Sequence, residues 1–324
     1  MPAPLLALSE ILAAAEALPS WVRRTPVLPL DPDGEVWAKA ESLQVTGSYK
    51  IRAAWTVLSR IPREDRPRGA ALSSSGNFAA AFAFAGRALG IPTTVVMMER
   101  TQPNKVRRTR ELGAEVLLCE NRFEARFETL RALEAERGLV VIDHLESRDV
   151  LAGHGTVGLE IAEDLPEAGA LLVPVSTAGL LAGVAAAVKA LRPQLRVYGV
   201  QPEGADATAR SLRSGEVVSI PEVSTICDAL TSTRPGGLPF AHVQALVEDV
   251  LTVSDEAVAE AVGWLAREAK LVVEPGGAIG LAALRSGRLV PEGRACVLLS
   301  GGNLSPERLA ELVLAAPGSA RAAG

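Results

Sequence analysis

Residues 70–98 read AALSSSGNFAAAFAFAGRALGIPTTVVMM, and this stretch decides the fold class. Its two ends, Ala70–Leu72 and Thr94–Met98, are short apolar runs of the length of buried strands. Between them, Ala79–Leu89 is an alanine-rich run of helical length. Unbroken apolar strands joined by a crossover helix are typical of parallel sheets that helices cover on both faces. The stretch therefore predicts a β-α-β unit of an α/β protein.

The same alternation continues on both sides of this unit. Further apolar runs of strand length are Val36–Ala40, Val116–Cys119, Val140–Ile142, Ala170–Val175, Val197–Val200 and Cys296–Leu299. Helical patterns lie between them at Ile51–Ile61, Asn104–Leu112, Glu124–Arg137, Leu180–Leu191 and Gly276–Arg285. We therefore expect an α/β protein built from parallel sheets along the whole chain.

Composition bounds the class of protein. The chain has 324 residues, which at roughly 150 residues per domain indicates about two domains. Apolar residues make up 48% and charged residues 22%, as in ordinary globular proteins. The net charge of −5 and the aromatic content of 4% argue against a nucleic-acid-binding surface. We expect a small-molecule ligand and no nucleic-acid partner.

Cysteine and histidine positions argue against a metal or disulfide framework. They are scattered, at Cys119, Cys227, Cys296, His144, His154 and His242. No CxxC pair or ligand-like spacing occurs among them, so we expect no zinc site and no disulfide scaffold.

The chain carries no recognisable targeting signal. No lysine or arginine precedes Arg23, and Glu10 and Glu16 interrupt the apolar N-terminal run, unlike a signal peptide. The long uncharged runs 69–86 and 169–188 are rich in alanine, glycine and serine. Each is better explained as a buried strand, a turn and a helix than as a membrane span. We expect a cytoplasmic protein with no membrane partner.

Three polar, glycine-containing loops follow predicted strands. They are Ser73–Asn77, Ser176–Gly179 and Ser300–Asn303. In α/β folds, ligands bind beyond the carboxyl ends of the strands, where these loops lie. Loops of this kind present free backbone N–H groups, which suit a phosphate and a carboxylate. The pattern favours a ligand site over simple tight turns.

Residues 41–52, ESLQVTGSYKIR, add a lysine to these loops, and together they resemble a known family. Other motifs that carry the resemblance are Arg24–Pro26, Ser75–Asn77, Leu151–Thr156, Glu274–Pro275 and Ser300–Asn303. The chain is similar to pyridoxal-phosphate (PLP) enzymes of the tryptophan synthase β-subunit fold, called fold type II. Within them it most resembles serine/threonine dehydratases and serine racemase. The resemblance implies two parallel-sheet αβα domains, with a small mobile domain of residues 69–146. Residues 1–68 and 147–324 would form the large cofactor-binding domain.

The resemblance also assigns roles to residues. Lys50 corresponds to the lysine that holds PLP as a Schiff base, and Asn77 to the residue that binds the ring hydroxyl. The cofactor-binding set it implies is Tyr49, Lys50, Asn77, Ser176, Thr177, Ala178, Gly179, Leu180, Glu274 and Ser300. The substrate-binding set is Ser74, Ser75, Gly76, Asn77, Phe78 and Arg126, and the catalytic residues are Lys50 and Ser75. A homodimer is expected.

Ser300 and Ser75 bear on the type of reaction. Ser300 matches the residue that faces the pyridine nitrogen, where a neutral hydroxyl makes the ring a weaker electron sink than an aspartate would. This favours β-elimination over transamination. Ser75 matches the serine that racemising members place opposite the lysine, which leaves racemisation open. Ser176–Gly179 keeps one glycine where relatives usually have four, so the backbone of this phosphate loop is in question.

Other positions depart from the family pattern and bear on the substrate. Phe78 stands where dehydratases and racemases commonly have histidine, so we expect weaker activity on plain serine and threonine and better activity on larger substrates. Arg126 is a candidate replacement for the lost hydrogen-bond donor. Glu146 is expected to add negative charge near the pocket and to disfavour acidic substrates. Gln201 and Ala207 stand where metal-binding members carry acidic residues, so no metal is expected.

These observations favour a PLP-dependent ammonia-lyase that converts a hydroxy amino acid such as L-threonine or L-serine to a 2-oxo acid and ammonia. One alternative keeps the cofactor but changes the reaction to racemisation or to β-replacement, as in cysteine synthases. A second is a less active relative that acts on an unusual β-substituted amino acid. A third is a nucleotide-binding protein, but residues 276–280, GGAIG, do not fit GxGxxG.

Overall fold

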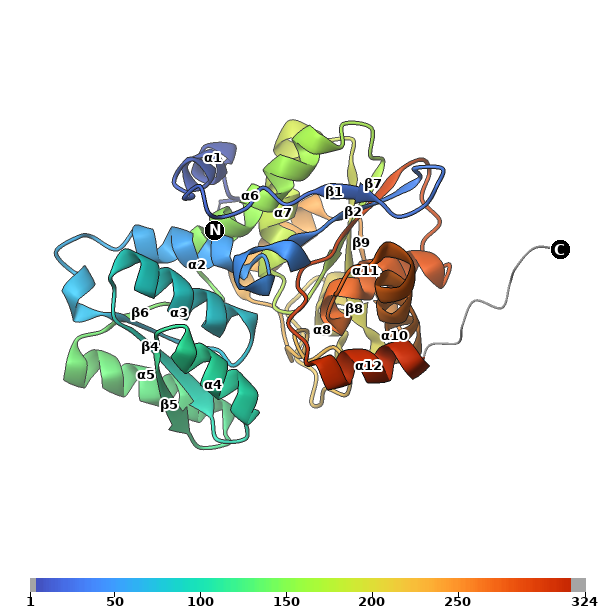
Figure 1. Cartoon of the computed structure of the whole chain (residues 1–324). Helices are drawn as coiled ribbons and strands as arrows, with labels where there is room; N and C mark the ends of the chain where they lie inside the picture. The colour runs from blue at the N-terminus through green and yellow to red at the C-terminus, as the bar shows by residue number, and fades with distance from the viewer. Residues whose placement is uncertain (1–3, 316–324) are drawn as a thin grey trace.

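The computed structural model describes residues 4–315, which form two sheets flanked by helices (Figure 1). One sheet has six strands in the order β1-β2-β10-β7-β8-β9, and the other has four in the order β5-β4-β3-β6. The strands are β1 (Val27–Pro29), β2 (Val36–Lys39), β3 (Ala70–Ser73), β4 (Thr93–Met98), β5 (Glu115–Cys119), β6 (Val140–Val141), β7 (Ala170–Pro174), β8 (Arg196–Pro202), β9 (Asp249–Val253) and β10 (Ala295–Leu298).

The α-helices alternate with these strands along most of the chain. They are α1 (Leu8–Glu16), α2 (Lys50–Ser59), α3 (Asn77–Leu89), α4 (Pro103–Glu111), α5 (Phe123–Arg137), α6 (Arg148–Asp164), α7 (Gly179–Leu191), α8 (Ala207–Ser214), α9 (Gly237–Leu246), α10 (Asp255–Trp264), α11 (Pro275–Arg285) and α12 (Pro306–Ala315). The α/β class predicted from the alternation is confirmed.

The four-stranded sheet is parallel throughout and lies within residues 69–146. Successive residues of β3 point to opposite faces: Leu72 packs in one apolar cluster with α3, and Ala71 packs in another with α5. Helices therefore cover both faces, as the β-α-β pattern of residues 70–98 predicts. Helix α2 lies outside this segment in sequence, yet its Ile51 and Val57 join the same cluster as Leu72. Helix α2 thus packs against the small sheet.

The six-stranded sheet is parallel except at one edge, where β1 pairs antiparallel with β2. Its two faces pack against α10 and α11 on one side and α6 and α7 on the other. The sequence pattern did not predict β1 or β9. Strand β1 is only three residues long and ends in a proline, and β9 has an exposed first residue and two half-buried ones. Edge strands such as these lack the continuous apolar run of a central strand.

Helices α6 and α7 cross at very short range because small residues line their contact. A methyl carbon added at Gly183 of α7 would lie 2.3 Å from the Leu151 carbonyl oxygen and 3.0 Å from Cβ of His154, both on α6. Only glycine leaves room for this approach. The contact brings His154 beside the first turn of α7.

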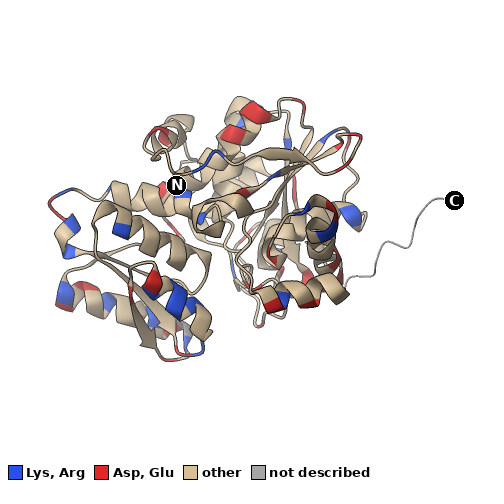
Figure 2. Ribbon diagram, viewed as in Figure 1, with Lys and Arg blue, Asp and Glu red and all other residues tan. Residues whose placement is uncertain are grey.

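The outer surface mixes both signs of charge. Blue and red segments alternate along α5 and α12 in Figure 2, which agrees with the alternating acidic and basic residues in their sequences. Between residues 4 and 315, no helix combines the length and apolarity that a membrane span requires.

Candidate active site

Lys50 opens helix α2 at a place where two aromatic rings flank its amine. Its Nζ lies 4.7 Å from the centre of the Tyr49 ring and 5.3 Å from that of Phe78. Burial lowers the pKa of Lys50 to about 8, and the nearby Glu274 carboxylate opposes this shift. No carboxylate forms an ion pair with Lys50 among residues 4–315. A substantial fraction of this amine is therefore neutral, and hence nucleophilic, at slightly alkaline pH.

A sharp turn before Lys50 is held by the loop that follows β10. Thr46 and Gly47 both have positive φ, 67° and 75°, and the Asn303 side chain donates a hydrogen bond of 2.8 Å to the Thr46 carbonyl. A methyl carbon at Gly47 would come within 2.3 Å of the Asn303 Oδ1. The glycine before Lys50 is thus required both by its backbone conformation and by its close neighbour.

A cluster of buried charges anchors the helix that carries Lys50. The Arg52 guanidinium, which is fully buried, bonds Glu41 at 2.8 Å and Glu160 of α6 at 2.7 Å. Lys39 of β2, also fully buried, pairs with Glu160 at 2.6 Å. Buried charges are tolerated when they are paired in this way, because removing one partner leaves the remaining charge buried and uncompensated. The cluster therefore holds α2 rigidly against α6 and β2.

Asn77 is the centre of a polar chain between the two sheets. Its Nδ2 donates to the Glu274 carboxylate at 2.7 Å, and its Oδ1 accepts from the Asn303 amide at 2.8 Å. Burial, with Asp228 nearby, raises the pKa of Glu274 to about 7. One amide hydrogen of Asn77 has no acceptor among the described residues, so it is available to a ring hydroxyl.

The loop from Ser176 to Gly179 ends at the N-terminus of α7, and within the described chain no side chain caps that terminus. Ala178 adopts φ 70° and ψ −3°, the left-handed conformation usually reserved for glycine. The loop therefore keeps a glycine-like turn despite its sequence. Gly179 and Leu180 begin the helix, directly after Ser176, Thr177 and Ala178 in the chain. Free amides at a helix N-terminus are well suited to a phosphate.

Ser300 lies where β10 gives way to the loop that contacts the Lys50 turn. Its side chain is buried, and its carbonyl accepts a hydrogen bond of 3.1 Å from the Tyr49 N–H. The backbone contact places a neutral hydroxyl residue next to the start of α2. Such a residue can face a pyridine nitrogen without forcing it to stay protonated.

The residues expected to bind substrate line the end of β3. Ser74, Ser75 and Gly76 form the half-exposed loop that leads into α3, whose N-terminus no side chain of residues 4–315 caps. Phe78 is buried, and its ring lies 5.2 Å from that of His144. Within the described residues, no hydrogen bond joins Ser75 to Lys50, so the assigned role of Ser75 stays a prediction.

His144 was missed as a site residue by the sequence analysis. Burial, with Lys50 and Arg126 nearby, lowers the pKa of His144 to about 4, so the ring is neutral at physiological pH. A neutral imidazole retains one N–H donor. His144 thus supplies an imidazole beside Phe78, where the family pattern has one in the position of Phe78 itself. Arg126 lies near enough to act on His144 electrostatically.

Glu146 has contacts other than those expected for it. Its carboxylate accepts hydrogen bonds from the backbone N–H groups of Gly237 at 2.6 Å and Leu238 at 2.8 Å. Glu146 therefore caps the N-terminus of α9, a position where the helix dipole stabilises negative charge. Its contacts give no support to the expectation that it acts on the substrate.

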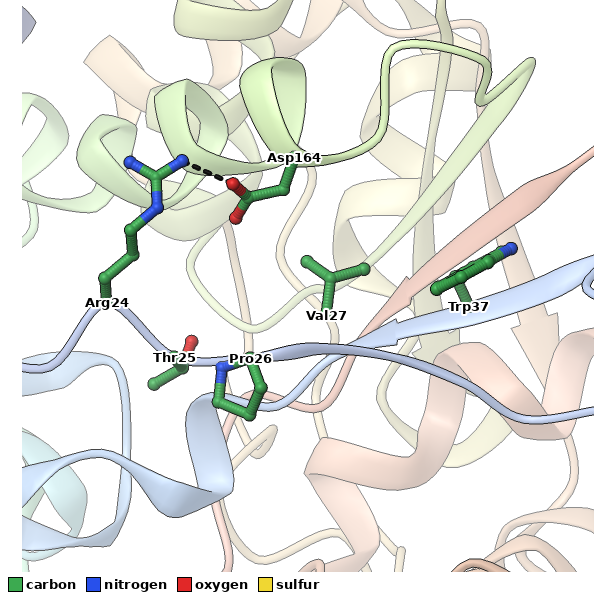
Figure 3. A pocket seen from close by; sticks show the side chains of 6 residues that line it. All are labelled: Arg24, Thr25, Pro26, Val27, Trp37 and Asp164. Atoms are coloured by element: carbon green, nitrogen blue, oxygen red, sulfur yellow. Dashed lines mark hydrogen bonds and ion pairs between the residues drawn. The ribbon is translucent and has the colours of Figure 1, made fainter.

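One cavity adjoins this region, and a second does not. One, of about 210 Å³, is lined by Phe127, Leu130, Ile142 and His144, together with neighbouring residues of the small sheet. The other, of about 380 Å³, is lined by Arg24, Thr25, Pro26, Val27, Trp37 and Asp164, and Figure 3 shows Arg24 paired with Asp164 there. The second cavity shares no residue with the Lys50 site, and its Asp164 pairs with Lys39 of the buried charge cluster.

Comparisons with known proteins agree with this geometry. A family model described as "Pyridoxal-phosphate dependent enzyme" matches residues 18–301. The L-threonine ammonia-lyase of Thermotoga maritima is 35% identical over 95% of this chain and 78% of its own length. The L-threo-3-hydroxyaspartate ammonia-lyase of a Pseudomonas species is 37% identical over 94% of this chain and 97% of its own. The solved structure of maize serine racemase superposes with a TM-score of 0.91 at 32% identity, covering 95% of this chain and 97% of that one.

The chain has the fold of a type II PLP enzyme. It belongs to the family of pyridoxal-phosphate-dependent enzymes. The residues present fit that cofactor. The partly neutral Lys50 amine can hold the aldehyde, the uncapped N-terminus of α7 the phosphate, and Asn77 and Ser300 the two polar positions of the ring. Among residues 4–315, no group of acidic, histidine or cysteine side chains is arranged to hold a metal ion.

Proposed function

We propose that this protein catalyses the β-elimination of a hydroxy amino acid, which yields a 2-oxo acid and ammonia. The observation that carries the proposal is the Lys50 amine, which forms no ion pair within residues 4–315 and is flanked by Tyr49 and Phe78, and whose pKa is lowered to about 8. Relatives named as ammonia-lyases, 35% and 37% identical over almost the whole chain, support this reaction.

The cofactor, when bound, supplies an electron sink that stabilises the charge left on the substrate's Cα. Lys50 would hold the cofactor, and its Nζ, once free, would take the proton from Cα of the substrate. A lysine with a lowered pKa suits this task, because its neutral form is available near the working pH. The β-hydroxyl would then leave as water with a proton from the Lys50 Nζ, while the electron pair at Cα forms a Cα–Cβ double bond, and hydrolysis of the resulting enamine would give the 2-oxo acid and ammonia. Because the electron pair is discharged in this way, a strong, protonated sink is not needed. Ser300, a neutral partner, is consistent with that requirement.

We assign the cofactor to Tyr49, Lys50, Asn77, Glu274, Ser300 and the loop 176–180. Asn77 orients the ring hydroxyl, and its own orientation is fixed by Glu274 and Asn303, which occupy its other hydrogen bonds. We assign the substrate carboxylate to the loop Ser74–Gly76 and the N-terminus of α3, where free amides gather.

The substrate side chain should extend toward Phe78, His144 and Arg126. His144 offers a neutral donor and Arg126 a positive charge acting on the same region. Together they are compatible with L-threonine and with an acidic β-hydroxy acid, the substrate type named for the Pseudomonas relative. The engagement of Glu146 at α9 removes the argument from sequence against acidic substrates.

Two further features belong to the proposal. The segment 69–146 is proposed as a small domain that closes over the substrate through the loop Ser74–Gly76. A homodimer in the cytoplasm is proposed from the resemblance. Light scattering on the purified protein tests the dimer, and crystals with and without a bound amino acid test the closure.

The reaction is tested by incubating the PLP-loaded enzyme with L-threonine, L-serine and L-threo-3-hydroxyaspartate while measuring 2-oxo acid and ammonia. Equal amounts of both products are expected from at least one substrate, and none from the Lys50→Ala variant. Release of no 2-oxo acid from any of the three contradicts the proposal.

Racemisation is the second candidate, because Ser75 lies on the substrate loop and the maize serine racemase matches over nearly the whole chain. Chiral chromatography of the same reaction mixtures distinguishes it. If racemisation occurs, the Ser75→Ala variant should lose it and retain elimination.

A further inference from the structure

His154 is a buried polar side chain whose ring nitrogens, within residues 4–315, have no hydrogen bond of good geometry, although the Gly179 backbone lies close to the ring. It lies on α6 and is 1% exposed, and neither of its ring nitrogens forms a hydrogen bond within the described residues. Buried polar groups are nearly always hydrogen-bonded, because an unpaired one keeps the full cost of leaving water. An orphaned imidazole in a packed interior therefore points to a ligand that completes it.

The ring faces the first turn of α7. A methyl carbon at Gly179, the first residue of that helix, would lie 3.7 Å from Nδ1 of His154. On its other side the ring lies 4.9 Å from the Tyr49 ring, next to Lys50. His154 is thus held between the lysine that carries the cofactor and the helix terminus that is free to bind an anion.

The ring is in its neutral form. Burial lowers the pKa of His154 well below its usual range, Lys50 lowers it further, and the Gly179 backbone opposes the shift only in part. A neutral imidazole carries one N–H donor, and a phosphate oxygen is a strong acceptor. His154 can therefore donate a side-chain hydrogen bond to an anion that binds at the uncapped N-terminus of α7.

We propose that His154 donates a ring N–H hydrogen bond to the phosphate of the bound cofactor at the N-terminus of α7. The proposal rests on the cofactor site and not on the reaction that follows. A residue of α6 would then share in binding the phosphate with the loop 176–179. That loop has a single glycine. His154 acts here as a binding residue, separate from the proton transfer at Lys50.

The test measures cofactor binding without any substrate. The wild type and the His154→Leu and His154→Gln variants are stripped of cofactor and titrated with PLP and with pyridoxal, which lacks the phosphate. Absorbance reports the bond to Lys50. A hydrogen bond to a charged group corresponds to about tenfold or more in affinity. We expect His154→Leu to weaken PLP binding by about that factor and to leave pyridoxal binding unchanged, and His154→Gln to retain most of the PLP affinity.

Two results overturn the proposal. One is wild-type PLP affinity in the leucine variant, and the other is an equal loss for PLP and pyridoxal, which indicates a merely structural role. If the leucine variant does not fold, ¹⁵N NMR of the wild-type imidazoles decides the question. The His154 nitrogen signals should differ between the PLP-loaded and pyridoxal-loaded protein, and identical signals refute the bond. Because no substrate is used, this result is independent of whether 2-oxo acid is ever released.

Discussion

Glu274 provides a quantitative test of the site's electrostatics. It is 3% exposed, and burial raises the pKa of its carboxyl from 4.5 to about 7. Between these two values the folded protein keeps a proton that the unfolded chain has lost, so the free energy of unfolding falls as the pH rises. A shift of this size corresponds to about 3 kcal/mol of the free energy of unfolding, and this amount is lost in full above pH 7. Glu274→Gln cannot ionise, so the variant should avoid this loss.

The assay is denaturant unfolding of the cofactor-free wild type and Glu274→Gln at pH values from 4.5 to 8. The difference between their unfolding free energies should move in favour of the variant by about 3 kcal/mol across this range. The substitution also changes the hydrogen bond to Asn77, which alters the free energy of unfolding by an amount that does not depend on pH. Glu64→Gln, at an exposed carboxyl, is the control for removing a charge. A difference that stays flat with pH would falsify the assignment of the raised pKa to Glu274.

Three further predictions follow from other contacts. Borohydride reduction of the PLP-loaded protein should fix the cofactor on Lys50, and a label on another lysine contradicts the site. In the cofactor-free protein, labelling of the Lys50 amine by an amine-directed reagent should rise with pH, with a midpoint near pH 8. Glu146→Ala should destabilise the protein by about 1–2 kcal/mol, through the loss of the α9 cap, in thermal unfolding, whereas the exposed Glu136→Ala should not. Phe78→His should raise kcat/KM on L-threonine about tenfold; unchanged kinetics show that His144 already supplies the donor.

The fold class could be predicted from the sequence because its signals are local. The apolar runs of β3 and β4 and the helix between them need no distant partner to be recognised. The proposal of Lys50 as the cofactor lysine rests on a signal that is equally local, the loop before it. The backbone of the proposed phosphate loop, residues 176–179, was harder to predict because the loop has one glycine, and only the structure shows Ala178 in the left-handed conformation.

The edge strands show where local signals become insufficient. Strand β9 pairs with β8, and β1 with β2, through backbone hydrogen bonds that no side-chain pattern encodes strongly. Their residues are only partly buried, so the hydrophobic periodicity that identifies central strands is weak there.

The sequence by itself determined the α/β class, the family and the motifs that carry its chemistry. The tertiary structure decided which side chains complete those motifs. Asn303 lies 226 residues from Asn77, and Glu146 caps a helix that begins 91 residues later. His154 faces a helix terminus that is distant in sequence and adjacent only because Gly183 lets α6 and α7 approach closely. Such partners are brought together by the packing of whole elements, whose burial and contacts are long-range properties that no short stretch of sequence contains.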